Sequence, residues 1–230
     1  MNAELSAPQE ADRAKAHQAI RAFFFINFFM NGTFMPFLGL YLMTTLPSSA
    51  EVGIILAISP IVKLIFQPIW AMLSGKQEKQ VQYLFISLVG LAIASLGYLV
   101  SKNFTTLLLT TIIFSIIDAP YMPLGTSIAI NYLTRAGEQQ IFGKFRLWGT
   151  IGFIVSSTLI GPLLIGKYDY LFPVVYSISA LISAFFALRL PAYKNLEEQA
   201  TEASQHSSPF FNRRFVLFLA GVGMVGFSMG

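Results

Sequence analysis

The chain has 230 residues, of which 55% are hydrophobic and only 11% are charged, and its formal net charge is +4. A soluble domain carries about 25% charged residues, so the composition excludes an ordinary water-soluble protein. There is no cysteine and there are only two histidines, both in polar tails, so we expect neither a metal site nor a cofactor. The basic residues lie in short turns between apolar runs, which indicates membrane orientation and not nucleic-acid binding.

Six apolar runs follow one another along the chain, each long enough to cross a bilayer. A hydrocarbon core about 30 Å thick needs roughly 20 helical residues. The predicted spans are residues 22–43, 52–73, 83–100, 104–133, 145–166 and 170–190. A polar tail at 1–21 precedes them, a polar linker at 191–214 follows, and a seventh apolar run occupies 215–230. This pattern predicts an all-α, multi-pass membrane protein.

Lysine and arginine residues indicate the orientation of these spans. Most of them lie before the first span, after the second, after the fourth and after the sixth, whereas the alternate connections hold only Lys102 and Lys167. Cytoplasmic loops carry the excess of basic residues. We therefore expect a cytoplasmic N-terminus and linker, in a cell membrane that in bacteria would be the inner membrane.

The layout of six spans, a long linker and a new apolar run is typical of one half of a two-bundle transporter. We expect a C-terminal six-helix half as the partner of this chain, and we expect the chain alone to insert into the bilayer without transporting. The alternative is a non-transporting polytopic sensor or scaffold. An enzyme is not expected, because no His, paired Asp or Ser constellation is present, and the absence of a GxxxxGK[ST] motif argues against a nucleotide-driven pump.

Two ionisable residues lie deep within predicted spans. Asp118 is about 14 residues into the fourth span, roughly 21 Å along a helix, and Pro120 should bend the helix just after it. Lys63 lies about 11 residues into the second span, on one stripe with Ser59 and Gln67. Because intramembrane charges need partners, we predict a Lys63–Asp118 ion pair, in which Asp118 is either a protonation site for proton coupling or the counter-ion of Lys63. The alternative for Asp118 is a neutral carboxyl that bonds helices together.

Four further polar or aromatic residues are candidates for binding a solute. Arg146 lies near the cytoplasmic end of the fifth span, where position alone favours an interfacial arginine. Asn27 and Asn31 lie one turn apart in the first span. We expect them either to line a cavity or to form hydrogen bonds between helices. Trp148 is either an interfacial tryptophan or part of the same site as Arg146.

The segment Phe-Gly-Lys-Phe-Arg-Leu-Trp-Gly at 142–149, followed by Gly152-Phe153, resembles the major facilitator superfamily of transporters. It is most similar to the branch of lactose-permease-like sugar/proton symporters and phenylpropionate permeases, in which a related segment opens the fifth helix. The resemblance implies a six-helix N-terminal bundle of the major facilitator fold, made of two inverted three-helix repeats, with a truncated seventh helix. It also implies that Arg146 binds substrate and that the fifth helix begins nearer Glu138.

Two features depart from the family pattern. In the family, a motif with an aspartate and several basic residues usually follows the second helix. In this chain the loop keeps basic residues, Lys76 and Lys79, but not that aspartate. In the fourth helix, Pro123 and Leu124 are followed by Gly125 where relatives often carry an acid, and the acid here is Asp118. The resemblance therefore implies secondary transport of a small organic solute (a sugar, nucleoside or aromatic acid), with proton symport by alternating access, and leaves the solute open.

Overall fold

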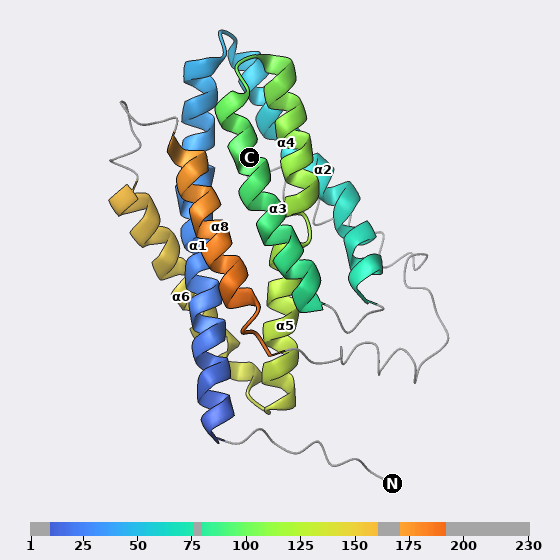
Figure 1. Cartoon of the computed structure of the whole chain (residues 1–230), viewed down its shortest axis with the longest axis vertical. Coiled ribbons are helices and arrows are strands. Elements are labelled where there is room, and N and C mark those ends of the chain that lie inside the picture. The colour runs from blue at the N-terminus through green and yellow to red at the C-terminus, as the bar shows by residue number, and fades with distance from the viewer. Residues whose placement is uncertain (1–9, 76–79, 161–170, 192–230) are drawn as a thin grey trace. The chain divides into compact units, whose positions relative to one another are not determined.

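The computed structural model describes residues 10–75, 80–160 and 171–191, which form helices joined by short connections (Figure 1). These are α1 (Glu10–Thr45), α2 (Ser49–Gly75), α3 (Gln80–Val100), α4 (Phe104–Asp118), α5 (Tyr121–Arg135), the 3-10 turn η1 (Gln139–Ile141), α6 (Phe142–Val155), the π-helical turn η2 (Ser156–Ile160) and α8 (Phe172–Ala187). No strand occurs in this part of the chain. Nearly all of the predicted linker and the whole run at 215–230 lie outside the described residues.

Four helical segments are long and apolar enough to cross a membrane: Asp12–Thr45, Ser49–Ser74, Gln80–Val100 and Phe104–Arg135. They match the first four predicted spans. The fifth predicted span, 145–166, corresponds to α6 and η2 up to residue 160, and its last residues, 161–166, lie outside the described part of the chain. The sixth predicted span corresponds to the shorter apolar helix α8.

The fourth predicted span is divided between α4 and α5 directly after Asp118, at the position where the sequence predicted a bend. Asn103 begins α4 with a capping box, in which its side chain accepts a hydrogen bond from the Thr106 amide. The division falls at Ala119 and Pro120, because proline has no N–H to continue the helical hydrogen bonds.

Helix α1 begins at Glu10, well before the predicted span that starts at residue 22. Its 36 residues make a helix of about 54 Å, longer than the hydrocarbon core of about 30 Å. The polar tail predicted at 1–21 is therefore partly helical. Its first turns contact the α5–α6 connection, where Glu138 Oε2 lies 2.8 Å from His17 Nε2 and Glu138 Oε1 lies 3.9 Å from Arg13 Nη1.

Glycines bring α1 and α6 close together. A Cβ at Gly152 would overlap the carbonyl oxygen of Phe25, and one at Gly149 would lie 2.7 Å from the ring of Phe28. On the other helix, a Cβ at Gly32 would overlap Ser156 of η2. Small residues at such positions let membrane helices approach closely, which explains this packing.

Aromatic side chains fill the space between α1, α3, α4 and α8. The rings of Phe34 and Phe114 stack with centroids 4.7 Å apart, and Tyr176 lies 4.8 Å from Phe34. Tyr98 packs edge-on against Phe34 at 5.6 Å. These residues are all buried and belong to the main hydrophobic core of the described helices.

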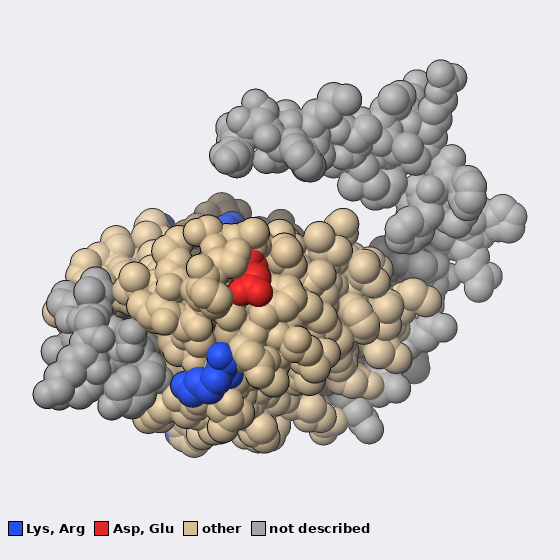
Figure 2. All heavy atoms as spheres, turned by 90° about the horizontal axis from the view of Figure 1, so that it is seen from above, with Lys and Arg blue, Asp and Glu red and all other residues tan. Residues whose placement is uncertain are grey.

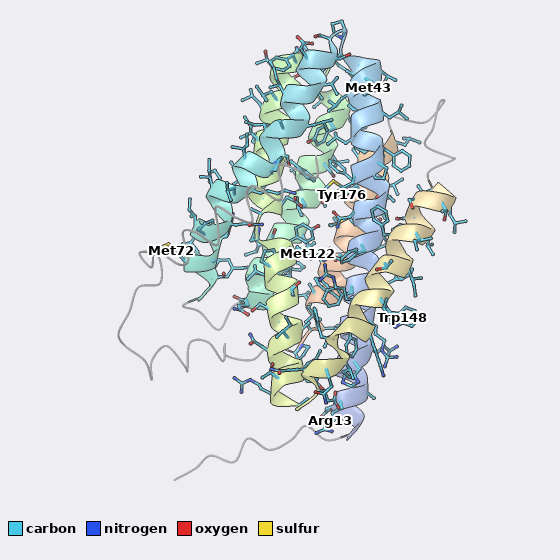
Figure 3. All side chains as sticks on the ribbon, turned by 180° about the vertical axis from the view of Figure 1, so that it is seen from behind. Arg13, Met43, Met72, Met122, Trp148 and Tyr176 are labelled. Atoms are coloured by element: carbon cyan, nitrogen blue, oxygen red, sulfur yellow. The ribbon has the colours of Figure 1, made fainter. Side chains whose placement is uncertain are left out.

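The outer faces of the helices are apolar. Leu64 and Met72 of α2 are exposed over 75% and 76% of their surface, and Met43 and Met72 point away from the bundle in Figure 3. Figure 2 looks along the helices onto the end where α1 meets α2, and few charged side chains are visible there. Large apolar surfaces of this kind suit contact with lipid and not with water.

Candidate functional site

A cavity of about 310 Å³ lies among α1, α2, α3, α4 and α8. Its polar lining comes from Asn31, Ser59, Lys63, Thr111 and Asp118, and its aromatic lining comes from the cluster that includes Phe34, Phe114 and Tyr176. Figure 3 labels Tyr176 within the bundle. A mostly apolar cavity with a few convergent polar groups is the usual form of a small-molecule site.

Lys63 Nζ and Asp118 Oδ2 form an ion pair in the wall of this cavity. Only 7% of the Asp118 side chain is exposed, against 24% of the Lys63 side chain, and both residues line the cavity. The partners come from α2 and α4, and the hydroxyls of Ser59 and Ser115 join the same two helices at 2.9 Å. Two opposite charges in an apolar bundle stabilise one another, because each would be costly to bury alone. Gln67, the third residue of the predicted stripe, is exposed.

Asn31 lines the cavity and contacts the residue that starts α5. Its Nδ2 donates to Tyr121 Oη at 2.8 Å, and the Tyr121 hydroxyl lies 3.1 Å from Asn31 Oδ1. Asn31 Nδ2 also donates to the main-chain oxygen of Asn27 at 2.9 Å. The side chain of Asn27 is completely buried, lies outside the cavity lining, and finds no hydrogen-bond partner within the described helices.

Arg146 and Trp148 lie apart from the cavity. Both are exposed on α6, and neither contributes to the lining. The reason is helical geometry: Phe145, Gly149 and Gly152 form the buried face of α6, and residues 146 and 148 point to other faces. Helix α6 begins at Phe142, one turn before the predicted span, so Arg146 lies in its second turn. Solute binding by Arg146, Trp148 and Asn27 remains a prediction.

The sequence did not predict the hydrogen bonds that two residues, Trp70 and Ser87, make close to the Lys63–Asp118 pair. Trp70 of α2 donates from Nε1 to the Ile116 carbonyl at 3.0 Å. Ser87 donates to the Ile117 carbonyl at 2.6 Å. The available signal was Pro120, whose missing N–H leaves the Ile116 carbonyl in need of another donor.

The described helices form a multi-pass apolar bundle with a cavity between them. The chain belongs to the MFS_1 like family, whose model matches residues 17–230. No solved structure gave a significant match.

Three relatives extend this assignment. The chain is 30% identical over 176 residues to the maltose permease of Geobacillus stearothermophilus, covering 74% of this chain and 43% of that protein. It is 28% identical over 177 residues to the uncharacterized transporter YwbF of Bacillus subtilis (strain 168), covering 76% and 44%. It is 22% identical over 185 residues to a protein of Escherichia coli (strain K12) named "Probable 3-phenylpropionic acid transporter", covering 80% and 48%. The chain thus spans about half the length of the curated relatives it matches.

Proposed function

We propose that this chain is the N-terminal part of a secondary active transporter for a small organic solute, with proton symport by alternating access. The observation that carries the proposal is the Lys63–Asp118 ion pair in the wall of a cavity between membrane helices. Charged residues inside a membrane bundle commonly mark substrate or proton pathways. The family membership and the transporter names of the relatives support the same function.

The ion pair can couple proton binding to a change in the packing of the helices. While Asp118 is ionised, it attracts Lys63 and holds α2 against α4. A proton bound by Asp118 removes that attraction and frees the ammonium to interact elsewhere in the cavity. Because the pair joins two helices, its formation and loss can be linked to a change in their packing.

The solute class is a sugar, a nucleoside or an aromatic acid. Hydrogen-bonding groups at Asn31 and Ser59 beside the rings of Phe34 and Phe114 suit a ring that carries polar substituents. Arg146 of α6 lies outside this cavity, and it would bind a hydroxyl or carboxylate of the solute at a separate contact, for which its bidentate guanidinium is suited. The remaining partners are the lipid bilayer and a C-terminal six-helix half. The N-terminus is expected in the cytoplasm.

The test is uptake of radiolabelled maltose, uridine and 3-phenylpropionate by the intact protein in proteoliposomes. We expect accumulation of one of these probes when an inward proton gradient is imposed. Asp118→Asn should abolish gradient-driven accumulation and retain exchange of labelled for unlabelled probe, since exchange needs no net proton movement. Arg146→Ala should reduce both processes.

Absence of uptake and exchange for all three probe classes would contradict the proposed transport. Gradient-driven accumulation by Asp118→Asn equal to that of the native protein would contradict the coupling role alone. Leu159→Ala is the control, because Leu159 of η2 is exposed and faces outward. This variant should transport at the native rate.

A further inference from the structure

Helix α4 ends at Asp118, so the carbonyls of its last turn have no partners in the same helix. The Ser115 carbonyl is satisfied by the amide of Ala119, which caps the helix. The Ile116 carbonyl would normally accept from residue 120, but that residue is a proline and has no N–H. The Ile116 carbonyl therefore needs a donor from outside the helix, and the Ile117 carbonyl next to it also accepts a hydrogen bond from another helix.

Both donors come from neighbouring helices. Trp70 of α2 reaches Ile116 with its indole N–H at 3.0 Å, and Ser87 of α3 reaches Ile117 with its hydroxyl at 2.6 Å. Ser87 is 4% exposed, and a Cβ at Gly90, one turn later, would lie 3.0 Å from the Ile117 side chain. Helix α3 thus packs closely against the end of α4 at the position of the break.

These contacts fix the position of the main chain next to Asp118. Ile116 and Ile117 immediately precede Asp118, and Trp70 lies on the same helix as Lys63, two turns further along. Trp70 therefore ties the end of α4 to the helix that supplies the partner ammonium, while Ser87 ties it to α3. In a membrane, freed backbone groups must be satisfied by protein, so loss of either donor favours a different placement of the break.

We propose that Trp70 and Ser87 are positioning residues for the Lys63–Asp118 ion pair, acting through the Ile116 and Ile117 carbonyls. The proposal rests on the proposed role of this pair in transport, but the geometry it describes is measurable without transport. It assigns Trp70 a function that its place near the end of a span does not suggest.

The experiment measures how fast dicyclohexylcarbodiimide, a membrane-permeant reagent for carboxyl groups, modifies Asp118 in the intact protein. Peptide mass spectrometry quantifies the product. Lys63→Gln serves as the reference for a lost ion pair, and its Asp118 should react faster than the native one. Trp70→Phe keeps an aromatic ring but removes the N–H, and Ser87→Ala removes the hydroxyl.

We expect both variants to increase the modification rate about threefold or more, the shift that corresponds to losing one interhelical hydrogen bond in a membrane protein. Trp70→His, which keeps a ring N–H, should restore part of the native protection. Ser95→Ala is the matched control, because Ser95 is also a buried serine of α3 but bonds to Ala92 and Pro173. Its Asp118 should react at the native rate.

Native rates in Trp70→Phe and Ser87→Ala, together with a raised rate in Lys63→Gln, would overturn the proposal. So would an equal increase in Ser95→Ala, because that would indicate general loosening of the bundle. Thermal unfolding in detergent identifies variants that have lost their fold. If Trp70→Phe is one of them, the proposal is tested with Ser87→Ala, which is the smaller change. A failure of the proposed transport would appear in the uptake assay and leave these rates unaffected.

Discussion

Lys63 and Asp118 form an ion pair between α2 and α4, one turn from the Ser59–Ser115 hydrogen bond that joins the same two helices. Neither residue has another oppositely charged partner among the described residues. The stability of the bundle and the chemistry of the cavity therefore depend on the same contact.

Neutralising one partner of this pair should destabilise the protein more than neutralising both. We expect Lys63→Gln or Asp118→Asn to cost about 3–5 kcal/mol, because each leaves a charge without its partner in an apolar environment. The double variant should recover part of this loss. Thermal or denaturant unfolding in detergent measures the coupling. Additive effects of the two substitutions would show that the pair contributes no net interaction.

The α1–α6 contact should not tolerate a side chain at Gly152. Gly152→Ala places a methyl group against the Phe25 carbonyl, so we expect a loss of about 1–3 kcal/mol. Gly143→Ala on the same helix is the matched control, because a Cβ there meets nothing within 4 Å and alanine favours helix. Unfolding midpoints of the two variants measure the difference. Equal stability would mean that α6 does not pack on α1 as described.

The Asn31–Tyr121 contact should behave as a coupled pair. Tyr121→Phe and Asn31→Ala each remove both of their mutual hydrogen bonds, so their combination should cost less than the sum. We expect a coupling energy of about 0.6–1.7 kcal/mol, the range for hydrogen bonds between membrane helices. A double-mutant cycle on unfolding free energies supplies the measurement, and a coupling of zero would contradict the contact.

Glu138 should contribute a small, salt-dependent stabilisation outside the membrane-spanning part. Glu138→Gln weakens contacts to both His17 and Arg13, which are partly exposed, so we expect a loss of no more than about 1 kcal/mol. High salt should reduce the difference by screening. Asp12→Asn is the control, because its pair with Lys15 is exposed and 4.0 Å long, and we expect no measurable effect. A loss from Glu138→Gln that is insensitive to salt would contradict an electrostatic origin.

Local properties of the chain predicted the membrane helices and the break in the fourth span. Hydrophobicity over a window of about 20 residues reflects the thickness of the bilayer, which acts on each helix separately. Proline at 120 lacks an N–H in any fold, so the end of α4 could be placed from the sequence. The start of α1 could not, because a helix can extend beyond the hydrophobic core that defines its apolar run.

The sequence by itself determined that this is a multi-pass helical membrane protein with two charges at depth and a broken fourth span. These features follow from the composition and order of neighbouring residues. Only the tertiary structure decided that Lys63 contacts Asp118, that Trp70 bonds to the end of α4, and that Arg146 lies outside the described cavity. The physical reason is that such contacts depend on which helix faces meet, and close packing between residues distant in the chain selects those faces.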